Sequence, residues 1–128
     1  MIDYPLLPDT PVSHLPYSPV VRAGHLVFVS GQASVDATGR IIGDSFAGEF
    51  ARSLDNMERV LRAAGCTLAD VIQTRNYLRD PADLAEYNRL YAERFHRPYP
   101  ARTTLTGCLP ATLRYEIECI AVVPGAAS

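Results

Sequence analysis

The segment PYPARTTLTGCLP (98–110) places a single arginine, Arg102, at the start of a stretch of β-forming residues. Pro98 and Pro100 favour an extended approach to this predicted strand. Arginine suits a two-pronged grip on a carboxylate, because its guanidinium is planar and presents parallel N–H donors. The pattern therefore makes Arg102 a candidate clamp for a small carboxylate ligand.

The segment RYEIECIAVV (114–123) supplies a carboxylate that could act with this arginine. Side chains alternate along a strand, so Arg102, Thr104 and Thr106 should share one face. If that face is free of helices, Arg102 and Glu118 face one groove between subunits, where Glu118 could hold a water and take its proton. The pattern leaves open that these two residues instead form a structural ion pair at an interface.

Other candidate residues each have a structural alternative. Tyr17 in LPYSP can line a site or pack against the chain. Ser30 and Gly31 can simply end a strand, although glycine lets a ligand approach the backbone. Asn88 can make a cap or interhelix hydrogen bond. Cys108 has no base nearby in sequence, so we expect an inert buried thiol.

Composition limits the class of protein. The chain has 128 residues with 48% hydrophobic and 20% charged residues, which predicts one globular domain over 1–128. A net charge of −2 with dispersed basic residues argues against a nucleic-acid or anionic-membrane partner. Three cysteines and three histidines without ligand spacing predict neither disulfides nor a metal site. With no signal-peptide pattern and no membrane-length apolar run, we expect a cytoplasmic protein.

The elements that must position these residues follow from hydrophobic periodicity. Residues 1–16 are proline-rich and predict an extended lead-in. Two apolar stripes at spacings of three and four predict two helices. The stripes are Phe46, Phe50, Leu54, Met57 and Leu61 in the first helix, and Leu84, Tyr87, Leu90, Tyr91 and Phe95 in the second. Strands are predicted at 25–31, 70–78, 103–107 and 114–123. With one more strand near the first of these, the overall order is roughly β-β-α-β-α-β-β.

Two helices cannot cover both faces of such a sheet, so we expect an α+β two-layer sandwich with both helices on one face of a mixed sheet. In the last strand, Tyr115, Ile117, Cys119, Ala121 and Val123 should lie under the helices. The opposite face begins charged, at Arg114, Glu116 and Glu118, and ends apolar. An open face of this kind predicts that a partner subunit covers it.

Several segments together resemble the RidA family, also called YjgF, in collinear order from about Tyr17 to Val123. They are PYSPVVRAGHLVFVSGQ (16–32), LDNMERVLRAAGCTLADVIQTRNYLRD (54–80), YNRLYAERF (87–95), PARTT (100–104) and YEIECIAVV (115–123). The resemblance implies a chorismate-mutase-like fold, a homotrimer with clefts between subunits, and a cofactor-independent enamine/imine deaminase.

The resemblance also implies residue roles. Arg102 would grip the substrate carboxylate and Glu118 would position the water. Tyr17, Ser30, Gly31 and Asn88 would line the cleft. Thr104, also at the cleft, stands where the best-known members have cysteine. The segment TLTGCLP is one residue shorter than in those members, and HLPYSP replaces the commoner G-P-Y-S-Q, so the cleft rim should differ in shape.

These observations predict hydrolytic deamination of a small 2-imino or enamine acid, of the 2-aminoacrylate or 2-iminopropanoate type, to a 2-keto acid and ammonia. One alternative is a module that binds or senses a carboxylate ligand in the same cleft. Another is a catabolic deaminase or hydrolase of a different small carboxylate substrate. Glu118 favours catalysis, because a pure carboxylate receptor gains nothing from an anionic group beside its ligand.

Overall fold

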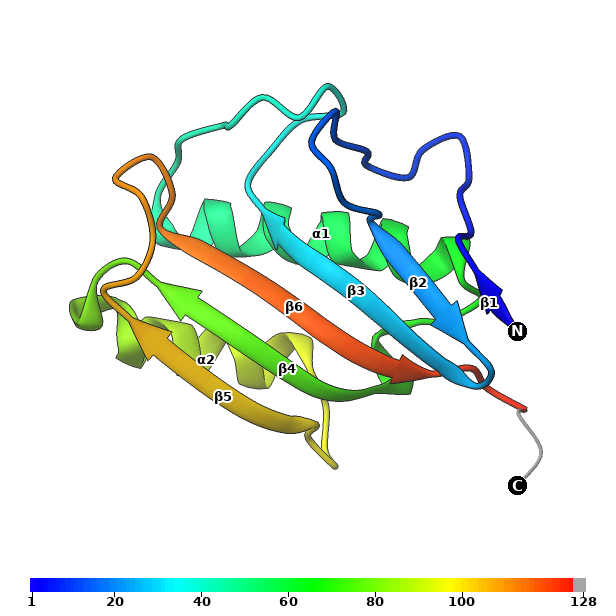
Figure 1. Cartoon of the computed structure of the whole chain (residues 1–128). Coiled ribbons are helices and arrows are strands. Elements are labelled where there is room, and N and C mark those ends of the chain that lie inside the picture. The colour runs from blue at the N-terminus through cyan, green and yellow to red at the C-terminus, as the bar shows by residue number, and fades with distance from the viewer. Residues whose placement is uncertain (126–128) are drawn as a thin grey trace.

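A computed structural model describes residues 1–125 as one mixed sheet with two helices packed on a single face (Figure 1). The strands are β1 (Ile2–Asp3), β2 (Val20–Ala23), β3 (Leu26–Ala33), β4 (Val71–Leu78), β5 (Ala101–Thr106) and β6 (Tyr115–Val122). The helices are α1 (Phe46–Ala63) and α2 (Leu84–Arg94), with short 3-10 turns at Leu68–Asp70 and Pro81–Asp83. The two-layer α+β sandwich predicted from the sequence is confirmed.

The strand order in the sheet is β1-β2-β3-β6-β4-β5. β4 and β5 run parallel and are joined through α2, whereas the other neighbouring pairs are antiparallel. The lead-in contains the short strand β1, which the sequence did not predict. The last strand in sequence, β6, lies in the middle of the sheet, and β5 forms an edge.

α1 begins where Ser45 caps it, since the side chain of Ser45 accepts a hydrogen bond from the amide of Gly48. The helix ends before Gly65, whose φ of +79° is a left-handed conformation that glycine adopts at little cost. All five residues of its predicted apolar stripe are buried, and the helix packs over β3 and β6.

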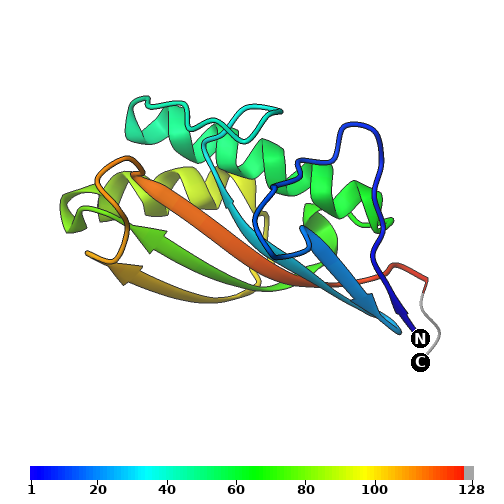
Figure 2. The same cartoon turned by 45° about the horizontal axis from the view of Figure 1, so that its top comes forward.

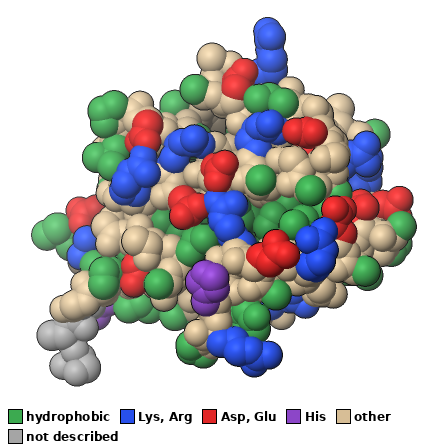
Figure 3. Space-filling view, turned by 180° about the vertical axis from the view of Figure 1, so that it is seen from behind, with side chains coloured by type: hydrophobic (Ala, Val, Ile, Leu, Met, Phe, Trp, Pro, Cys, Tyr) green, Lys and Arg blue, Asp and Glu red, His purple; other side chains and the backbone are tan. Residues whose placement is uncertain are grey.

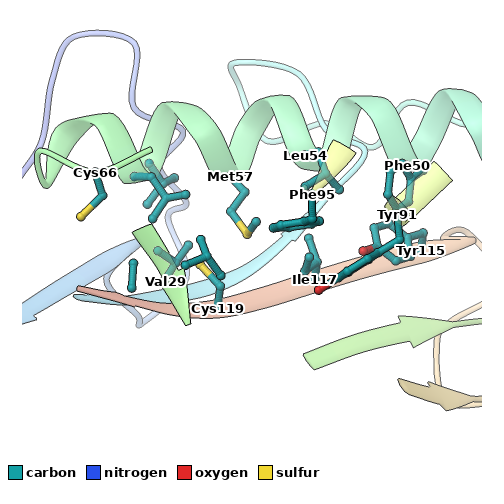
Figure 4. Packing of buried hydrophobic residues seen from close by; sticks show 14 of the residues in the cluster. Val29, Phe50, Leu54, Met57, Cys66, Tyr91, Phe95, Tyr115, Ile117 and Cys119 are labelled. Atoms are coloured by element: carbon teal, nitrogen blue, oxygen red, sulfur yellow. The ribbon is translucent and has the colours of Figure 1, made fainter. Parts of the chain in front are cut away.

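α2 contributes aromatic side chains to the same core. Tyr87, Tyr91 and Phe95 are buried, and the rings of Tyr91 and Phe95 stack with centroids 4.4 Å apart. Phe50 of α1 meets Tyr115 of β6 at 4.9 Å between centroids, which joins the two layers (Figure 4). The core therefore gathers its large aromatic rings under the end of the sheet that carries α2.

The outer surface of the helix layer is charged and of mixed sign (Figure 3). Arg94 of α2 forms ion pairs with Asp55 and Glu58 of α1, which link the two helices. Among residues 1–125, neither helix is long and apolar enough to cross a membrane. The helix layer has the mixed-sign charged surface expected of a face in contact with water.

The opposite face of the sheet carries no helix (Figure 2). Along β6 the buried residues are Tyr115, Ile117, Cys119 and Ala121, while Glu116, Glu118, Ile120 and Val122 lie on the open face and are partly buried. Phe28, which pairs with Ile120, is 40% exposed. The predicted change from charged to apolar along this face is confirmed.

Candidate functional site

Arg102 lies on the helix side of the sheet. In the strand register Arg102 pairs with Thr74 of β4, and Thr74 pairs with Cys119 of β6. Residues paired in this way point to the same side, and both Thr74 and Cys119 are buried beneath the helices. The expected placement of Arg102 on the helix-free face, together with Glu118, is therefore wrong.

Two tyrosines of α2 hold the guanidinium of Arg102. Its central carbon lies 4.9 Å from the ring centroid of Tyr87 and 4.9 Å from that of Tyr91. Such cation–π contacts stabilise by about 0.5–1 kcal/mol each at exposed sites. Within residues 1–125 Arg102 forms no salt bridge, and it is exposed at the sheet edge. The guanidinium is thus oriented by the rings and open to an incoming anion.

The rings of Tyr87 and Tyr91 are held by hydrogen bonds from their hydroxyls to threonines of the sheet. The hydroxyls of Tyr87 and Thr104 lie 2.7 Å apart, and those of Tyr91 and Thr74 also lie 2.7 Å apart. Asn76 donates to the Thr74 hydroxyl at 3.0 Å. Burial raises the pKa of Tyr91 to about 12, so its hydroxyl stays protonated and hydrogen-bonded. Thr104 acts here through its hydroxyl, by holding the ring that supports the arginine.

A pocket of about 450 Å³ opens beside Arg102. Its lining residues are Asn88, Tyr91, Ala92, Arg97, Tyr99, Pro100 and Arg102. The approach to β5 is not extended throughout, because the chain bends at residues 97 and 98 and the Arg97–Pro98 peptide bond is cis. The structure thus places Asn88 and Arg102, both predicted from the sequence, on the walls of one pocket, which we call the arginine pocket.

Glu118 lies on the open face with its own partners. The hydroxyl of Tyr77 donates a hydrogen bond to its carboxylate, and Arg75 lies 3.7 Å away as an ion-pair partner. The hydrogen bond to Glu118 is the main reason that the pKa of Tyr77 is raised to about 12. Two neighbouring side chains of β4 therefore already engage this carboxylate.

Glu116 lies on the same face, two residues earlier, against Gly31. A Cβ added at Gly31 would meet Oε2 of Glu116 at 2.5 Å, so glycine lets the carboxylate keep this position. An irregularity in the β3–β6 pairing between Val29 and Gln32 accompanies this approach. Burial raises the pKa of Glu116, and the negative charge of Glu118 raises it further. Nothing in the sequence pattern distinguished Glu116 as a site residue.

Glu116, Gly31 and Tyr17 line a second pocket, of about 240 Å³, between the lead-in and the sheet. We call it the glutamate pocket. Tyr17 is 50% exposed at its rim. Ser30 fastens the lead-in to β3, since its hydroxyl donates to the carbonyl of Ser18 at 2.6 Å and its amide donates to that of Pro19 at 2.9 Å. The hydroxyl of Ser30 is therefore used within the chain.

The expectation that Cys108 is a buried thiol is wrong. Its thiol is exposed, whereas those of Cys66 and Cys119 are buried. The residue follows Gly107, whose φ of +74° turns the chain out of β5 into the loop that leads to β6. Cys108 therefore lies on a surface loop and not in the core.

The predicted site residues thus fall into two groups on opposite faces of the sheet. Arg102, Asn88 and Thr104 belong to the arginine pocket and its support, while Tyr17 and Gly31 belong to the glutamate pocket. The first group can bind a carboxylate and the second can hold a water beside a carboxylate base. Within residues 1–125, no group of three His, Cys, Asp or Glu side chains gathers as a metal site.

Comparison with known proteins identifies relatives along almost the whole chain. The family model described as Endoribonuclease L-PSP matches residues 8–123. Reactive Intermediate Deaminase A, chloroplastic, of Arabidopsis thaliana is 37% identical over 84% of this chain and 59% of its own length. The 2-iminobutanoate/2-iminopropanoate deaminase of Homo sapiens is 34% identical over 84% of this chain and 80% of its own length.

Solved structures agree with the sequence comparisons. The crystal structure of E. coli TdcF with bound serine superimposes with a TM-score of 0.82 at 31% identity, and the match covers 94% of this chain and 98% of that one. The ligand named for that structure is a small amino acid, which carries a carboxylate.

Proposed function

Since the chain belongs to the RidA (YjgF) family, which the Endoribonuclease L-PSP model describes, we propose that it hydrolyses small 2-imino acids or their enamine tautomers to 2-keto acids and ammonia. The observation that carries the proposal is Arg102, an unpaired guanidinium held by two tyrosine rings at the mouth of a pocket. The names of the Arabidopsis and human relatives support the reaction type.

The reaction begins when Arg102 binds the substrate carboxylate through two parallel hydrogen bonds. This grip fixes the neighbouring iminium carbon in place, and fixed geometry removes much of the entropy cost of attack. A water adds to that carbon and gives its proton to a carboxylate base. The base then returns the proton to the nitrogen of the carbinolamine and the C–N bond breaks as ammonia leaves. The hydroxyl gives its own proton to the same carboxylate as the carbonyl of the keto acid forms. The mechanism needs no cofactor, because the protonated imine is already an electrophile.

We assign the base to Glu116, with Glu118 as the competing candidate. The carboxylate of Glu118 accepts a hydrogen bond from Tyr77 and is paired with Arg75, so both contacts already occupy it within the chain. Glu116 faces the glutamate pocket, and burial raises its pKa towards the pH at which an enzyme works. A carboxylate of raised pKa is the better acceptor of a proton from water.

Arg102 and Glu116 act on one substrate only if two chains supply them, because within one chain they face opposite sides of the sheet. The partly apolar open face, with Phe28 and Ile120, offers a surface for a second copy. We therefore propose a homotrimer in which the arginine pocket of one subunit meets the glutamate pocket of the next. Three free thiols suit a reducing compartment, and we place the protein in the cytoplasm.

A carboxylate-binding module that does not turn its ligand over is the alternative function. The same Arg102 would hold the ligand. Support comes from the E. coli TdcF structure, which has serine bound, an amino acid that carries a carboxylate. A carboxylate beside the ligand favours turnover, since its negative charge opposes simple binding of an anion.

The test is direct. An amino-acid oxidase produces 2-iminopropanoate or 2-iminobutanoate in the cuvette, and semicarbazide traps the imine that remains. We expect the protein to reduce the trapped product at catalytic concentrations. If the imine decays at the same rate with and without the protein while keto acids still bind, the binding module is correct.

A further inference from the structure

A second arginine, Arg97, also lines the arginine pocket. We propose that Arg97 binds an acidic group on the substrate side chain, so that the preferred substrates are 2-imino dicarboxylic acids. This inference rests on the proposed function for the reaction, but its binding part can be tested separately.

The first argument is the charge of the pocket wall. Of its seven lining residues, two are arginines, one is the amide Asn88, and none carries a carboxylate. Within residues 1–125 neither Arg97 nor Arg102 forms a salt bridge. A ligand with one carboxylate neutralises one of these cations and leaves the other facing it. A ligand with two carboxylates neutralises both.

The second argument is that Arg97 is positioned and not free. Its guanidinium carbon lies 5.2 Å from the ring centroid of Tyr99, which also lines the pocket. Pro98 and Pro100 follow these two residues and restrict their backbone angles. Arg102 has the same kind of support from Tyr87 and Tyr91. The pocket thus has two guanidiniums, each lying over aromatic ring faces.

The third argument concerns which carboxylate each arginine takes. Arg102 is on strand β5, supported by buried rings, so it is the more rigid of the two and fits the carboxylate next to the reacting carbon. Arg97 lies in the loop between α2 and β5, outside the sheet, so it is assigned the distal carboxylate. In the proposed complex, a four- or five-carbon dicarboxylate, as in the imines of aspartate and glutamate, places one carboxylate on each arginine.

The kinetic test compares 2-iminoglutarate with 2-iminopropanoate on the wild type and on Arg97→Gln. The variant should lose about fivefold or more in kcat/KM for 2-iminoglutarate, mainly through KM, because a charge-assisted bond to the distal carboxylate is gone. Hydrolysis of 2-iminopropanoate, which has no distal carboxylate, should fall much less than that of 2-iminoglutarate. Arg89→Gln is the matched control, since Arg89 is an exposed arginine of α2 that pairs with Glu86 and Glu93 outside the pocket.

A binding experiment separates this inference from the proposed reaction. Calorimetry compares 2-oxoglutarate with 2-oxopentanoate, in which a methyl group replaces the distal carboxylate. The wild type should bind 2-oxoglutarate more tightly, and Arg97→Gln should remove that preference even if no imine is turned over. Equal binding of the two keto acids by the wild type, or an equal effect of Arg97→Gln on both, would overturn the role of Arg97. Loss of imine turnover alone would instead count against the deaminase.

Discussion

Arg102 and Glu116 stand on opposite faces of one sheet, on strands β5 and β6, which are separated by β4. Their side chains cannot meet within a chain. Each nevertheless lines a pocket of its own, and each pocket lacks what the other has: one has cations and no base, the other a base of raised pKa and no arginine. The predictions below follow from this separation.

Complementation between chains tests the shared site. Arg102→Ala and Glu116→Gln should each be inactive alone, because every site then lacks one of the two groups. Assemblies formed by co-expressing both variants should regain part of the activity, since some sites receive Arg102 from one chain and Glu116 from its neighbour. Light scattering on a sizing column should show trimers throughout. Mixed trimers without activity, or a stable active monomer, would contradict the arrangement.

Replacing each glutamate in turn identifies the base. Glu116→Gln should reduce kcat by about 10²-fold or more, the usual scale for a general base, while keto-acid binding persists. Glu118→Gln should keep most of the turnover, because its contacts are to Tyr77 and Arg75 and not to the glutamate pocket. The reverse result, with a folded trimer in both cases, would assign the base to Glu118 as the sequence pattern suggested.

The pH profile gives the base a second signature. The base must be ionised, so kcat should fall as the pH drops through the pKa of Glu116, and that pKa lies above the ordinary 4.5. Glu118→Gln removes a neighbouring negative charge that helps to raise this pKa, so the acidic limb should move to lower pH. An acidic limb that stays in place in Glu118→Gln would show that Glu116 does not produce it.

Arg102→Lys should lose activity although the charge is kept. An ammonium cannot reproduce two parallel N–H bonds to a carboxylate, nor spread over two ring faces as a guanidinium does. We expect kcat/KM to fall about tenfold or more, with melting temperature nearly unchanged. Arg89→Lys on the exposed side of α2 is the control. Wild-type kinetics for Arg102→Lys would make Arg102 a structural residue.

Gly31→Ala should disturb the base without unfolding the protein. The added methyl would lie 2.5 Å from Oε2 of Glu116, so the carboxylate must move, and its flexible end can do so at small cost. Turnover should fall while the thermal transition shifts little. Gly43→Ala serves as the control, because a Cβ there meets nothing within 4 Å. Equal kinetics for the two variants would place the reacting water away from Gly31.

Most of the fold could be predicted from the sequence because the helices and the last strand have clear apolar periodicity. The stripe from Phe46 to Leu61 and the alternation from Tyr115 to Ala121 both match burial in the structure. The RidA resemblance is confirmed by the family model over residues 8–123. The helical stripe and the strand alternation depend on local periodicity, which can be read from a single sequence.

The side of the sheet that Arg102 occupies could not be predicted in the same way. β5 is an edge strand whose residues are mostly exposed on both faces, so ARTTLT shows no apolar alternation that would fix its orientation. Glu116 and Glu118 share a face, and spacing alone cannot distinguish them. What separates them is the close approach of Gly31 from β3 and the contacts of Tyr77 and Arg75 from β4, which arise only when distant segments pair.

The two arginines of the pocket have unequal freedom to vary. The rings beneath Arg102, Tyr87 and Tyr91, are core residues, so replacing them would loosen the fold and the grip together. Arg97 and Tyr99 are exposed, and their loss removes nothing from the core. Mutational drift, or a directed-evolution library, can therefore change Arg97 at one wall with little loss of stability, while selection for stability keeps the tyrosine rings that orient Arg102 at the other.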